Sequence, residues 1–438
     1  MTTRRRRIGW LLLAATAAAL FARTRTKGHL PTGRSQRNTH VAKLGVAVGA
    51  NYAGTAARKV FANAERRIEL NQERELRTAE AVAERLGNMK GALMKLGQMA
   101  SYLDEALPGP LREALAQLQS NAPPMSAELA AQVIERDLGA RPEQLFVQWD
   151  PQPIAAASIG QVHRAVVLDP ATGQERAVAV KVQYPGVAEA VAADLRNANL
   201  LGMLLQQGFG GLNPDDMVAE IKERLTEELD YRLEARNQQL FADFYRGHPF
   251  IHVPEVLPTF SSAHVITSEL VDGCTWQQML QWSQPEKDRV GEVLFRFVFR
   301  SLYGMHAFNG DPHPGNYLFH RDGRITFLDF GLVKHFSDEE MATFIAMVRT
   351  AAFEHDVSGF RAVVERAGML RPGCPSPDAE VGTYFSQFYE AVSDDHEVTW
   401  SSDYASRIVR HTFDRTSPIA QYATVPKAFV FIQRINLG

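Results

Sequence analysis

The sequence predicts an α+β fold with two lobes and a helical extension before them. The chain has 438 residues, which is more than one hydrophobic core usually organises. Strand patterns in residues 163–169 and 176–185 flank a turn that contains Pro and Gly, as expected of a β-hairpin. Long helix-forming stretches lie on both sides of this hairpin. We therefore expect a small lobe built on a sheet and a large, mainly helical lobe.

The composition is that of a globular protein, with 45% hydrophobic and 22% charged residues. The 47 basic and 50 acidic residues give a formal net charge of -3, so we expect no nucleic-acid partner. Cys274 and Cys374 are too few for a disulfide framework, and we expect both to be reduced and structural. His163, His306 and His313 lie in no Cys/His cluster with metal-ligand spacing, so we interpret them as structural too.

The first 149 residues contain a linker followed by helices. Residues 23–40 are polar and basic, and residues 41–85 change from small apolar residues to a charged, helix-forming stretch. Another helix in residues 94–108 ends at a pair of prolines, and Ser126 is placed to cap the next one. The chain thus divides into an apolar, anchor-like and basic segment (1–40), a helical extension (41–149), the small lobe (150–271) and the large lobe (272–438).

The segment AAASIGQVH (155–163) comes directly before the hairpin. Backbone amides in such a loop can cradle phosphates. Its three alanines carry Cβ atoms and cannot adopt the positive φ angles that glycine tolerates, so we expect a stiffer loop than a glycine-rich one. The residues expected to contact the nucleotide here are Ala155, Ala156, Ala157, Ser158, Ile159, Gly160 and Gln161.

The second strand of the hairpin carries Lys181, which alternates with Val178 and Val180 across the sheet. A lysine on this strand resembles the lysine of the VAIK motif, whose ammonium group meets nucleotide phosphates. Glu234 lies in a downstream helical stretch and is the natural partner of Lys181, as the helix-to-strand ion pair of an assembled kinase lobe.

The helical stretch around Glu234, residues 214–245, is interpreted as one uninterrupted helix that also carries Glu228 and Asp230. Glu228 and Glu234 are about 120° apart around the helix axis, so they should meet different partners. Asp230 and Glu234 share a face and would repel each other without a cation. We expect Lys95 to pair with Glu228 and Asp230; the alternative is an acidic helix face exposed to solvent.

The large lobe begins after two further strand-like runs in residues 252–273. The segment from Glu269 to Val271 is the expected passage between the lobes and should offer backbone hydrogen bonds to adenine. The next helix, residues 286–308, is amphipathic and delivers the catalytic loop. Residues after 338 look helical, with a polar break at 371–379. The core residues expected from the amphipathic helix are Phe295, Phe297, Phe299 and Leu302.

Two short segments, GDPHPGN (310–316) and LDFG (328–331), have the spacing of a metal-nucleotide site. Their carboxylates and amide are the parts that protein-kinase-like enzymes use for phosphoryl chemistry. Hard oxygen ligands suit Mg²⁺. We therefore expect Asn316 and Asp329 to hold Mg²⁺ beside ATP, and Asp311 to orient the nucleophile or accept its proton.

Together these motifs resemble the UbiB/AarF family of atypical protein-kinase-like proteins. The resemblance covers roughly residues 60–335 in collinear order, and the KxGQ and alanine-rich motifs distinguish this family from ordinary kinases. The matching segments are KLGQ (95–98), AAASIGQVH (155–163), VKVQYPG (180–186), EELDYRLEA (227–235), DPHPGN (311–316) and LDFG (328–331).

The resemblance implies a protein-kinase-like bilobal fold in which the KxGQ helix lies over the nucleotide site. Lys181 would contact the phosphates, and Asn316 and Asp329 would hold the metal. Lys95 and Gln98, at i and i+3, share one helix face and would project into the cleft where a peptide substrate otherwise lies. Such a lid, with Lys95 meeting Glu228 and Asp230, argues against phosphorylation of protein substrates in trans.

The function implied by the resemblance is Mg-ATP-dependent ATPase or small-molecule kinase activity in ubiquinone or membrane-lipid homeostasis. The acceptor would be a membrane lipid or an isoprenoid small molecule. A nucleotide-sensing scaffold, or regulatory pseudokinase, is the alternative, but the intact Lys181, Asp311, Asn316 and Asp329 favour chemistry. A conventional Ser/Thr protein kinase is disfavoured by the alanine loop, by the KxGQ helix and by the lack of an APE-like segment after LDFG. Protein partners are not indicated by any motif.

The amino terminus suggests membrane association. Residues 8–22 form an apolar run between basic residues, but the run is shorter than the roughly 20 residues that cross a bilayer comfortably. A short anchor, a helix at the membrane interface and an uncleaved signal remain open, as do a disordered leader and an over-extended start. We expect the catalytic domain to be cytoplasmic, at the cytoplasmic membrane in a bacterium, because secretion would separate it from ATP. The resemblance implies that bacterial relatives often carry carboxy-terminal membrane helices, and residues 429–438 are not expected to form one. We therefore expect either a truncated sequence or a membrane contact at the amino terminus.

Overall fold

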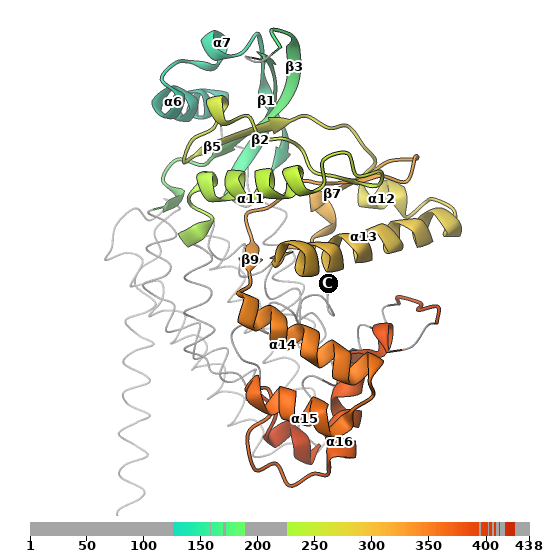
Figure 1. Cartoon of the computed structure of the whole chain (residues 1–438). Helices are drawn as coiled ribbons and strands as arrows, with labels where there is room; N and C mark the ends of the chain where they lie inside the picture. The colour runs from blue at the N-terminus through green and yellow to red at the C-terminus, as the bar shows by residue number, and fades with distance from the viewer. Residues whose placement is uncertain are drawn as a thin grey trace, which may run out of the picture. The chain divides into compact units, whose positions relative to one another are not determined.

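The structure is a computed structural model of the whole chain (Figure 1). The chain divides into two compact units, Met1–Asn88 and Met89–Gly438, and all described residues belong to the second. The predicted apolar run at the amino terminus and the helix that carries Lys95 and Gln98 lie outside the described residues. The structure describes residues 126–157, 159–169, 172–188, 226–393, 396–401, 403–404, 407–408, 411 and 417–424.

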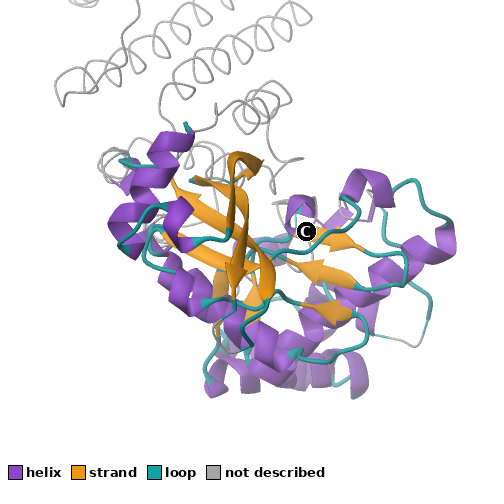
Figure 2. Cartoon of the chain, turned by 90° about the horizontal axis from the view of Figure 1, so that it is seen from above, coloured by secondary structure: helices purple, strands orange, loops and turns teal. Residues whose placement is uncertain are grey.

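The small lobe contains a four-stranded antiparallel sheet with the strand order β1-β2-β3-β5. Figure 2 shows its twisted strands in orange. The predicted hairpin is confirmed, since β2 and β3 pair in continuous register from Gly160 opposite Gln183 to Leu168 opposite Glu175. The strands are β1 (Gln148–Ala156), β2 (Gly160–Leu168), β3 (Glu175–Gln183) and β5 (Val265–Glu269).

Strand β1 was not predicted, and the interpretation of Ala155 and Ala156 as loop residues was wrong. These two alanines end β1 and pair with Val162 and Gln161 of β2. The strand contains two prolines, lies at the edge of the sheet and shifts register between Trp149 and Ala155. Prolines are tolerated at sheet edges, and most of β1 is exposed, so its sequence shows no alternation of buried and exposed residues.

Helix α6 (Ala127–Leu138) covers one face of this sheet, and the short helix α7 (Pro142–Leu145) follows it. The predicted cap is present: the hydroxyl of Ser126 accepts a hydrogen bond from the backbone N–H of Leu129 at 3.3 Å. Apolar side chains of α6 pack with the valines of β3 in one buried cluster, whose members include Ala130, Val133, Ile134, Val178, Val180 and Val182.

Helix α11 (Tyr231–Phe244) corrects the predicted uninterrupted helix 214–245. Residues 228–229 form a turn, and Asp230 is the N-cap of α11, with its carboxylate accepting from the backbone N–H of Arg232 at 3.0 Å. Asp competes for backbone N–H groups in this way and so favours helix starts over helix interiors. The residues before Thr226 in the predicted helix lie outside the described ranges.

Two small sheets belong to the large lobe. The first has the order β4-β8-β7, and the second pairs β6 with β9. Their strands are β4 (Ile251–His252), β6 (Ala307–Asn309), β7 (Tyr317–Phe319), β8 (Ile325–Phe327) and β9 (Val333–His335).

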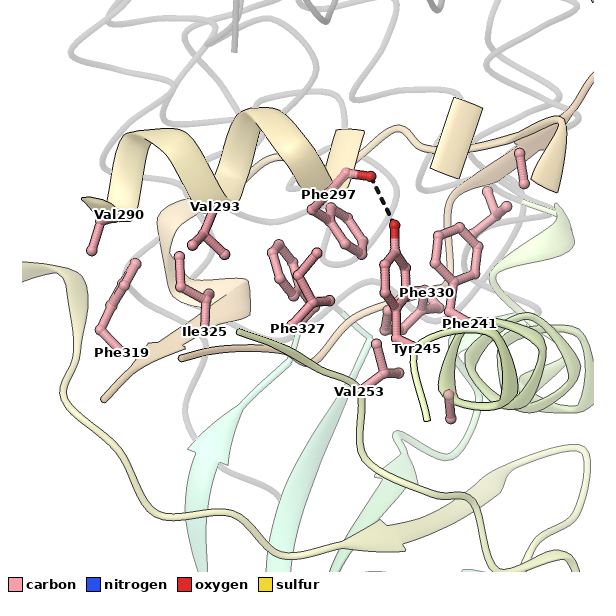
Figure 3. Packing of buried hydrophobic residues seen from close by; sticks show 14 of the residues in the cluster. Phe241, Tyr245, Val253, Val290, Val293, Phe297, Phe319, Ile325, Phe327 and Phe330 are labelled. Carbon is pink, nitrogen blue, oxygen red and sulfur yellow. Dashed lines mark hydrogen bonds between the residues drawn. The ribbon is translucent and has the colours of Figure 1, made fainter. Parts of the chain in front are cut away.

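Helix α13 (Gln284–Met305) packs on the β4-β8-β7 sheet through an aromatic core (Figure 3). The Phe297 ring stacks on Phe327 of β8 with centroids 3.6 Å apart, and the hydroxyl of Tyr245, just after α11, donates to the Phe297 carbonyl at 3.1 Å. The prediction that Phe297 and Leu302 are core residues is confirmed, whereas Phe295 and Phe299 are only half-buried. The helix ends before the predicted residue 308, because His306 adopts a left-handed conformation (φ 51°) and β6 begins.

The predicted helices after residue 338 are present and form a third buried cluster. They are α14 (Asp338–Val348), the π-helix η3 (Arg349–Phe353), α15 (Val357–Arg366) and α16 (Asp378–Ser386), with the predicted polar break between the last two. The remaining short elements are η1 (Pro258–Phe260), α12 (Trp276–Met279), η2 (Pro314–Asn316), η4 (Glu390–Val392) and η5 (Pro418–Gln421). Within the described ranges, no helix combines the length and apolar character needed to span a membrane.

Candidate active site

Lys181, Glu234 and Asp329 form one ionic cluster. The Lys181 Nζ lies 2.6 Å from Glu234 Oε1 and 3.6 Å from Asp329 Oδ2. Lys181 is central in the sheet, since its strand β3 lies between β2 and β5, and Glu234 is in the first turn of α11. The ion pair expected between Lys181 and Glu234 is therefore present. The side chains are 17%, 7% and 28% exposed for Lys181, Glu234 and Asp329, so the cluster is largely shielded from water.

Burial and mutual contacts shift the pKa values of Lys181 and Glu234. Burial opposes the charge of Lys181, but Asp329 and Glu234 raise the pKa of its ammonium group well above the ordinary value. Burial raises the pKa of the Glu234 carboxyl to about 7; Lys181 opposes this shift and the charge of Asp329 adds to it. Lys181 thus contacts two carboxylates, and a bound cation would place further positive charge beside them.

The loop after β6 brings Asp311 and Asn316 together. Asp311 is buried, and its carboxylate and its carbonyl accept from the amide nitrogen of Asn316 at 3.1 and 3.2 Å. The short helix η2 makes this return possible, with the backbone N–H of Gly315 donating to His313 Nδ1. Since the nitrogen of Asn316 makes both bonds, its oxygen is the atom suited to a cation.

The loop after β8 is tied to the loop of Asp311. The Leu328 N–H donates to the Asn316 carbonyl at 2.9 Å, and the Gly331 N–H donates to Asp329 Oδ1 at 2.9 Å. Asn309 bridges both loops, because its amide nitrogen donates to the Asp329 carbonyl at 2.8 Å and its oxygen accepts from the Asp311 N–H at 3.2 Å. The sequence analysis missed Asn309, although an asparagine two residues before a functional aspartate is a typical side chain-to-backbone turn former.

The donor set fits Mg²⁺. Asp329 and Asn316 lie on adjoining, hydrogen-bonded loops and offer a carboxylate and an amide oxygen, which are hard ligands. In the part of the chain that the structure describes, no three His, Cys, Asp or Glu residues are close enough to form a metal cage by themselves. This is compatible with Mg²⁺, which usually takes one or two protein ligands and completes its shell with phosphates and water.

The alanine-containing segment makes a tight turn between β1 and β2. The Ala157 N–H donates to the Gly160 carbonyl at 2.9 Å, and Ile159 is buried with its carbonyl accepting from the Tyr184 N–H. Ser158 lies outside the described residues. The Gln161 side chain is buried, 2.9 Å from His163 Nε2, so only its backbone stays a candidate for phosphate contact.

Strand β5 ends at Glu269, the first residue of the predicted passage between the lobes. The Glu269 carboxylate lies 3.4 Å from His252 Nε2 and 3.7 Å from Arg176, and the hydrogen bond with His252 lowers its pKa against the effect of burial. The Leu270 N–H donates to the Ala177 carbonyl of β3. These contacts fix the start of the segment that runs to Val271, and its contact with adenine stays a prediction.

The predicted pairing of Lys95 with Glu228 and Asp230 stays a prediction, and the structure describes only the two carboxylates. Asp230 has its own cation, since Arg232 Nε lies 2.9 Å from its carboxylate, and it is exposed. Glu228 is buried, and its charge raises the pKa of Glu234 further. The repulsion between Asp230 and Glu234 was expected only without a cation, and Arg232 and Lys181 contact the two carboxylates. The predicted partner Lys95 is not among the described residues.

Two residues of α11 belong to the site but escaped the sequence analysis. Tyr231 is buried, with Lys181 Nζ 5.1 Å from its ring centroid. Asn237 is buried one turn after Glu234 and bonds to Phe330 and His335. Both lie on the helix face that carries Glu234, and this i+3 spacing was the available signal.

The histidines singled out in the sequence occupy scaffold positions. His163 is buried beneath Trp149 with ring centroids 4.6 Å apart, and its Nδ1 lies 2.9 Å from the Asp150 carbonyl. His306 ends α13, and His313 supports the turn before Asn316.

Comparison with known proteins identifies the family. Residues 117–364, more than half of the chain, match the model of the ABC1 atypical kinase-like domain. The chain is 32% identical over 318 residues to the protein named atypical kinase COQ8, mitochondrial, of Saccharomyces cerevisiae, with 71% of this chain and 61% of the relative covered. It is 34% identical over 275 residues to the chloroplastic protein ACTIVITY OF BC1 COMPLEX KINASE 1 of Arabidopsis thaliana, covering 61% of this chain and 40% of the relative.

A solved structure with the same fold is that of Rv3197 from Mycobacterium tuberculosis in complex with erythromycin. The TM-score is 0.59 at 30% sequence identity, and the match covers 84% of this chain and 92% of that one. The chain spans less than two thirds of the length of the yeast and plant relatives. Its kinase-like α+β fold and its matched domain place it in the ABC1 family of atypical kinase-like proteins, the UbiB/AarF family that its motifs resemble.

Proposed function

We propose that the chain binds Mg-ATP and cleaves or transfers its γ-phosphoryl group, as an ATPase or as a kinase of a small molecule. The observation that carries this proposal is the cluster of Lys181, Glu234 and Asp329, next to the joined loops of Asp311 and Asn316. It offers a cation for phosphates, oxygen ligands for Mg²⁺ and a further carboxylate for the nucleophile.

Each residue of the site has a separate role in this proposal. Lys181 binds the phosphates and is held in place by Glu234. Asn316 and Asp329 hold Mg²⁺, which when bound neutralises charge on the phosphate oxygens. Asp311 orients the attacking hydroxyl or water and accepts its proton at the carboxylate. The turn between β1 and β2 offers phosphates its backbone amides other than that of Ala157, which donates to the Gly160 carbonyl, and the segment from Glu269 to Val271 binds adenine.

The acceptor in this proposal is an isoprenoid small molecule or a membrane lipid, and the pathway is ubiquinone or membrane-lipid homeostasis. The family resemblance supports this choice, as does the similarity to a mitochondrial protein named as an atypical kinase. We further propose that the chain associates with a membrane through its amino-terminal apolar run, with the catalytic domain in the cytoplasm. Lys95 and Gln98 would form a lid over the nucleotide that excludes peptide substrates.

Phosphate release from ATP, with and without phospholipid vesicles, tests the proposal. Asp329→Asn should reduce magnesium-dependent release at least about a hundredfold, the size expected when one charge-stabilising group is removed. Asp322→Asn is the matched control, because Asp322 lies in an exposed turn and pairs with Arg324 away from the site. Equal turnover in wild type and Asp329→Asn would reject the enzyme, and magnesium-dependent binding without turnover would favour a nucleotide-sensing scaffold.

The lid has its own test. Lys95→Ala should change the affinity for ATP or allow autophosphorylation, and a variant that matches the wild type in both assays would remove the lid from the proposal.

A further inference from the structure

Asn237 is a buried amide of α11 that contacts a single segment at two points. It is 5% exposed and lies three residues after Glu234, on the same helix face. Its nitrogen donates to the Phe330 carbonyl at 3.2 Å, and its oxygen lies 3.1 Å from His335 Nε2. The amide therefore spans the segment from Phe330 to His335.

The orientation of the Asn237 amide follows from its partners. The Phe330 carbonyl can only accept, so the nitrogen of Asn237 faces it and the oxygen faces His335. His335 must then donate from Nε2. Partial burial lowers the pKa of His335, and the charge of Lys334 lowers it further, which favours the neutral ring; the proton on Nε2 follows from the contact with the Asn237 oxygen. Both bonds are satisfied at once.

The contacted segment directly follows the candidate metal ligand Asp329 and supports the loop of Asp311 at its other end. Phe330 directly follows Asp329, and its buried ring packs on Phe241 of α11 with centroids 4.8 Å apart. His335 lies in β9 opposite Ala307 of β6, and β6 runs directly into the loop of Asp311. A shift of this segment away from α11 would therefore move the carboxylates of Asp329 and Asp311 relative to Lys181.

We propose that Asn237 is a positioning residue that holds the loop of Asp329 against the helix of Glu234. The position of α11 then fixes both the cation site, through Asn237, and the Lys181–Glu234 ion pair, through Glu234. This inference rests on the proposed function, because it assigns the purpose of the contact to Mg-ATP binding. It adds a residue that touches neither metal nor nucleotide.

The neighbouring residue provides a matched control. Gln238 is 2% exposed on the same helix, and its amide nitrogen donates to the Pro254 carbonyl at 2.8 Å. Gln238→Ala therefore also removes a buried amide and a bond to a backbone carbonyl. Because Pro254 lies outside the segment from Phe330 to His335, Gln238→Ala shows how much stability is lost when a buried amide and its hydrogen bond are removed from α11 without affecting that segment.

The experiment measures ATP binding by calorimetry over a series of Mg²⁺ concentrations, using the full chain. Asn237→Ala should raise the Mg²⁺ concentration for half-maximal binding about tenfold or more, as changes to outer-shell partners of metal ligands do. In Gln238→Ala the Mg²⁺ concentration for half-maximal binding should stay within about twofold of the wild-type value. The melting temperature of Gln238→Ala should fall by about as much as that of Asn237→Ala. Equal magnesium dependence in Asn237→Ala and Gln238→Ala would overturn the inference.

A second measurement is independent of nucleotide. Hydrogen exchange of the amides from residue 330 to 336 should be faster in Asn237→Ala than in Gln238→Ala, with no ligand present. His335→Ala, at an exposed position, removes one of the two bonds without threatening folding and should shift exchange and magnesium dependence in the same direction by about threefold. Hydrogen exchange that is unchanged from wild type in both Asn237→Ala and His335→Ala would reject the positioning role. If the wild type shows no magnesium-dependent ATP binding, the proposed function is rejected. The hydrogen-exchange measurement would still show whether Asn237 holds the segment from Phe330 to His335 in place.

Discussion

Gly160 and Tyr231 are packed so closely that a side chain at position 160 has no room. A Cβ atom on Gly160 would lie 2.7 Å from the Tyr231 hydroxyl oxygen and would also collide with the Val182 carbonyl of β3. Gly160 begins β2 and Tyr231 begins α11, so this contact is where the sheet meets the helix that carries Glu234. The close approach explains the glycine in the otherwise alanine-rich segment.

Gly160→Ala should destabilise the protein by about 1–3 kcal/mol, the usual cost of adding a methyl group to a filled site. The collision should also push α11 away from β3 and weaken the ion pair of Lys181 and Glu234. Urea unfolding measures the first effect, and ATP affinity measures the second. The control is Gly291→Ala on α13, where an added Cβ meets nothing within 4 Å. This substitution should stabilise the folded protein by about 0.5–1 kcal/mol, because alanine is favoured over glycine within a helix. Wild-type stability in Gly160→Ala would contradict this close packing of Gly160 against Tyr231 and β3.

Tyr231→Phe should be neutral or slightly stabilising. The Tyr231 hydroxyl is buried without a hydrogen-bond partner among the described residues, and an unsatisfied buried hydroxyl costs free energy. Its removal should also make space beside Gly160, so the double variant with Gly160→Ala should recover part of the lost stability. A double-mutant cycle should give a coupling of about 0.5–3 kcal/mol. Strict additivity of the two changes would show that the residues do not share this space.

Glu234 should make the nucleotide-free protein less stable as the pH rises. The pKa of its carboxyl is raised from 4.5 to about 7 in the fold. The folded state then binds this proton more tightly than the unfolded chain, so the stabilisation is complete below the lower value and is lost as pH rises through the higher one. Relative to Glu234→Gln, the free energy of unfolding of the wild type should fall with pH by up to about 1.4 kcal/mol per pH unit.

Urea unfolding in EDTA at about pH 5 and about pH 7.5 covers most of this range. The raised pKa of Lys181 acts only in more alkaline solution, so it does not contribute here. Glu292→Gln is the control, because Glu292 is exposed on α13 and pairs with Arg296. That variant should keep the wild-type slope. A Glu234→Gln variant that also keeps it would show that Glu234 does not titrate between these values.

Magnesium removal should abolish the stabilisation by ATP. A ligand that binds only the folded state adds about 2.7 kcal/mol at a concentration one hundred times its dissociation constant. The melting temperature should therefore rise with Mg-ATP and return toward the nucleotide-free value when EDTA is added. Asp329→Asn should show little rise at any magnesium concentration, whereas Asp322→Asn should behave as the wild type. An equal rise with and without EDTA would mean that ATP binds without the proposed cation.

The sequence predicted the parts of the fold whose signals are local. The hairpin of β2 and β3, the cap at Ser126 and the helices after residue 338 each follow from neighbouring residues. It failed where a local preference and a longer pattern disagreed. Helix-forming residues extend across Asp230, but the carboxylate of Asp230 caps α11 and interrupts the helix. The edge strand β1 escaped notice because its exposed residues and prolines give no alternating pattern.

By itself, the sequence determined the chemistry available to this protein: a strand lysine, a helix glutamate, and two oxygen-bearing loops in the order that the family uses. Those groups are recognisable because their type and spacing suit phosphates and Mg²⁺. Only the tertiary structure decided which other residues hold them in place. Asn309 bonds to a loop 20 residues away and Asn237 to one 93 residues away. Such bonds depend on how sheet, helix and loops pack, and no pattern of neighbouring residues specifies that packing.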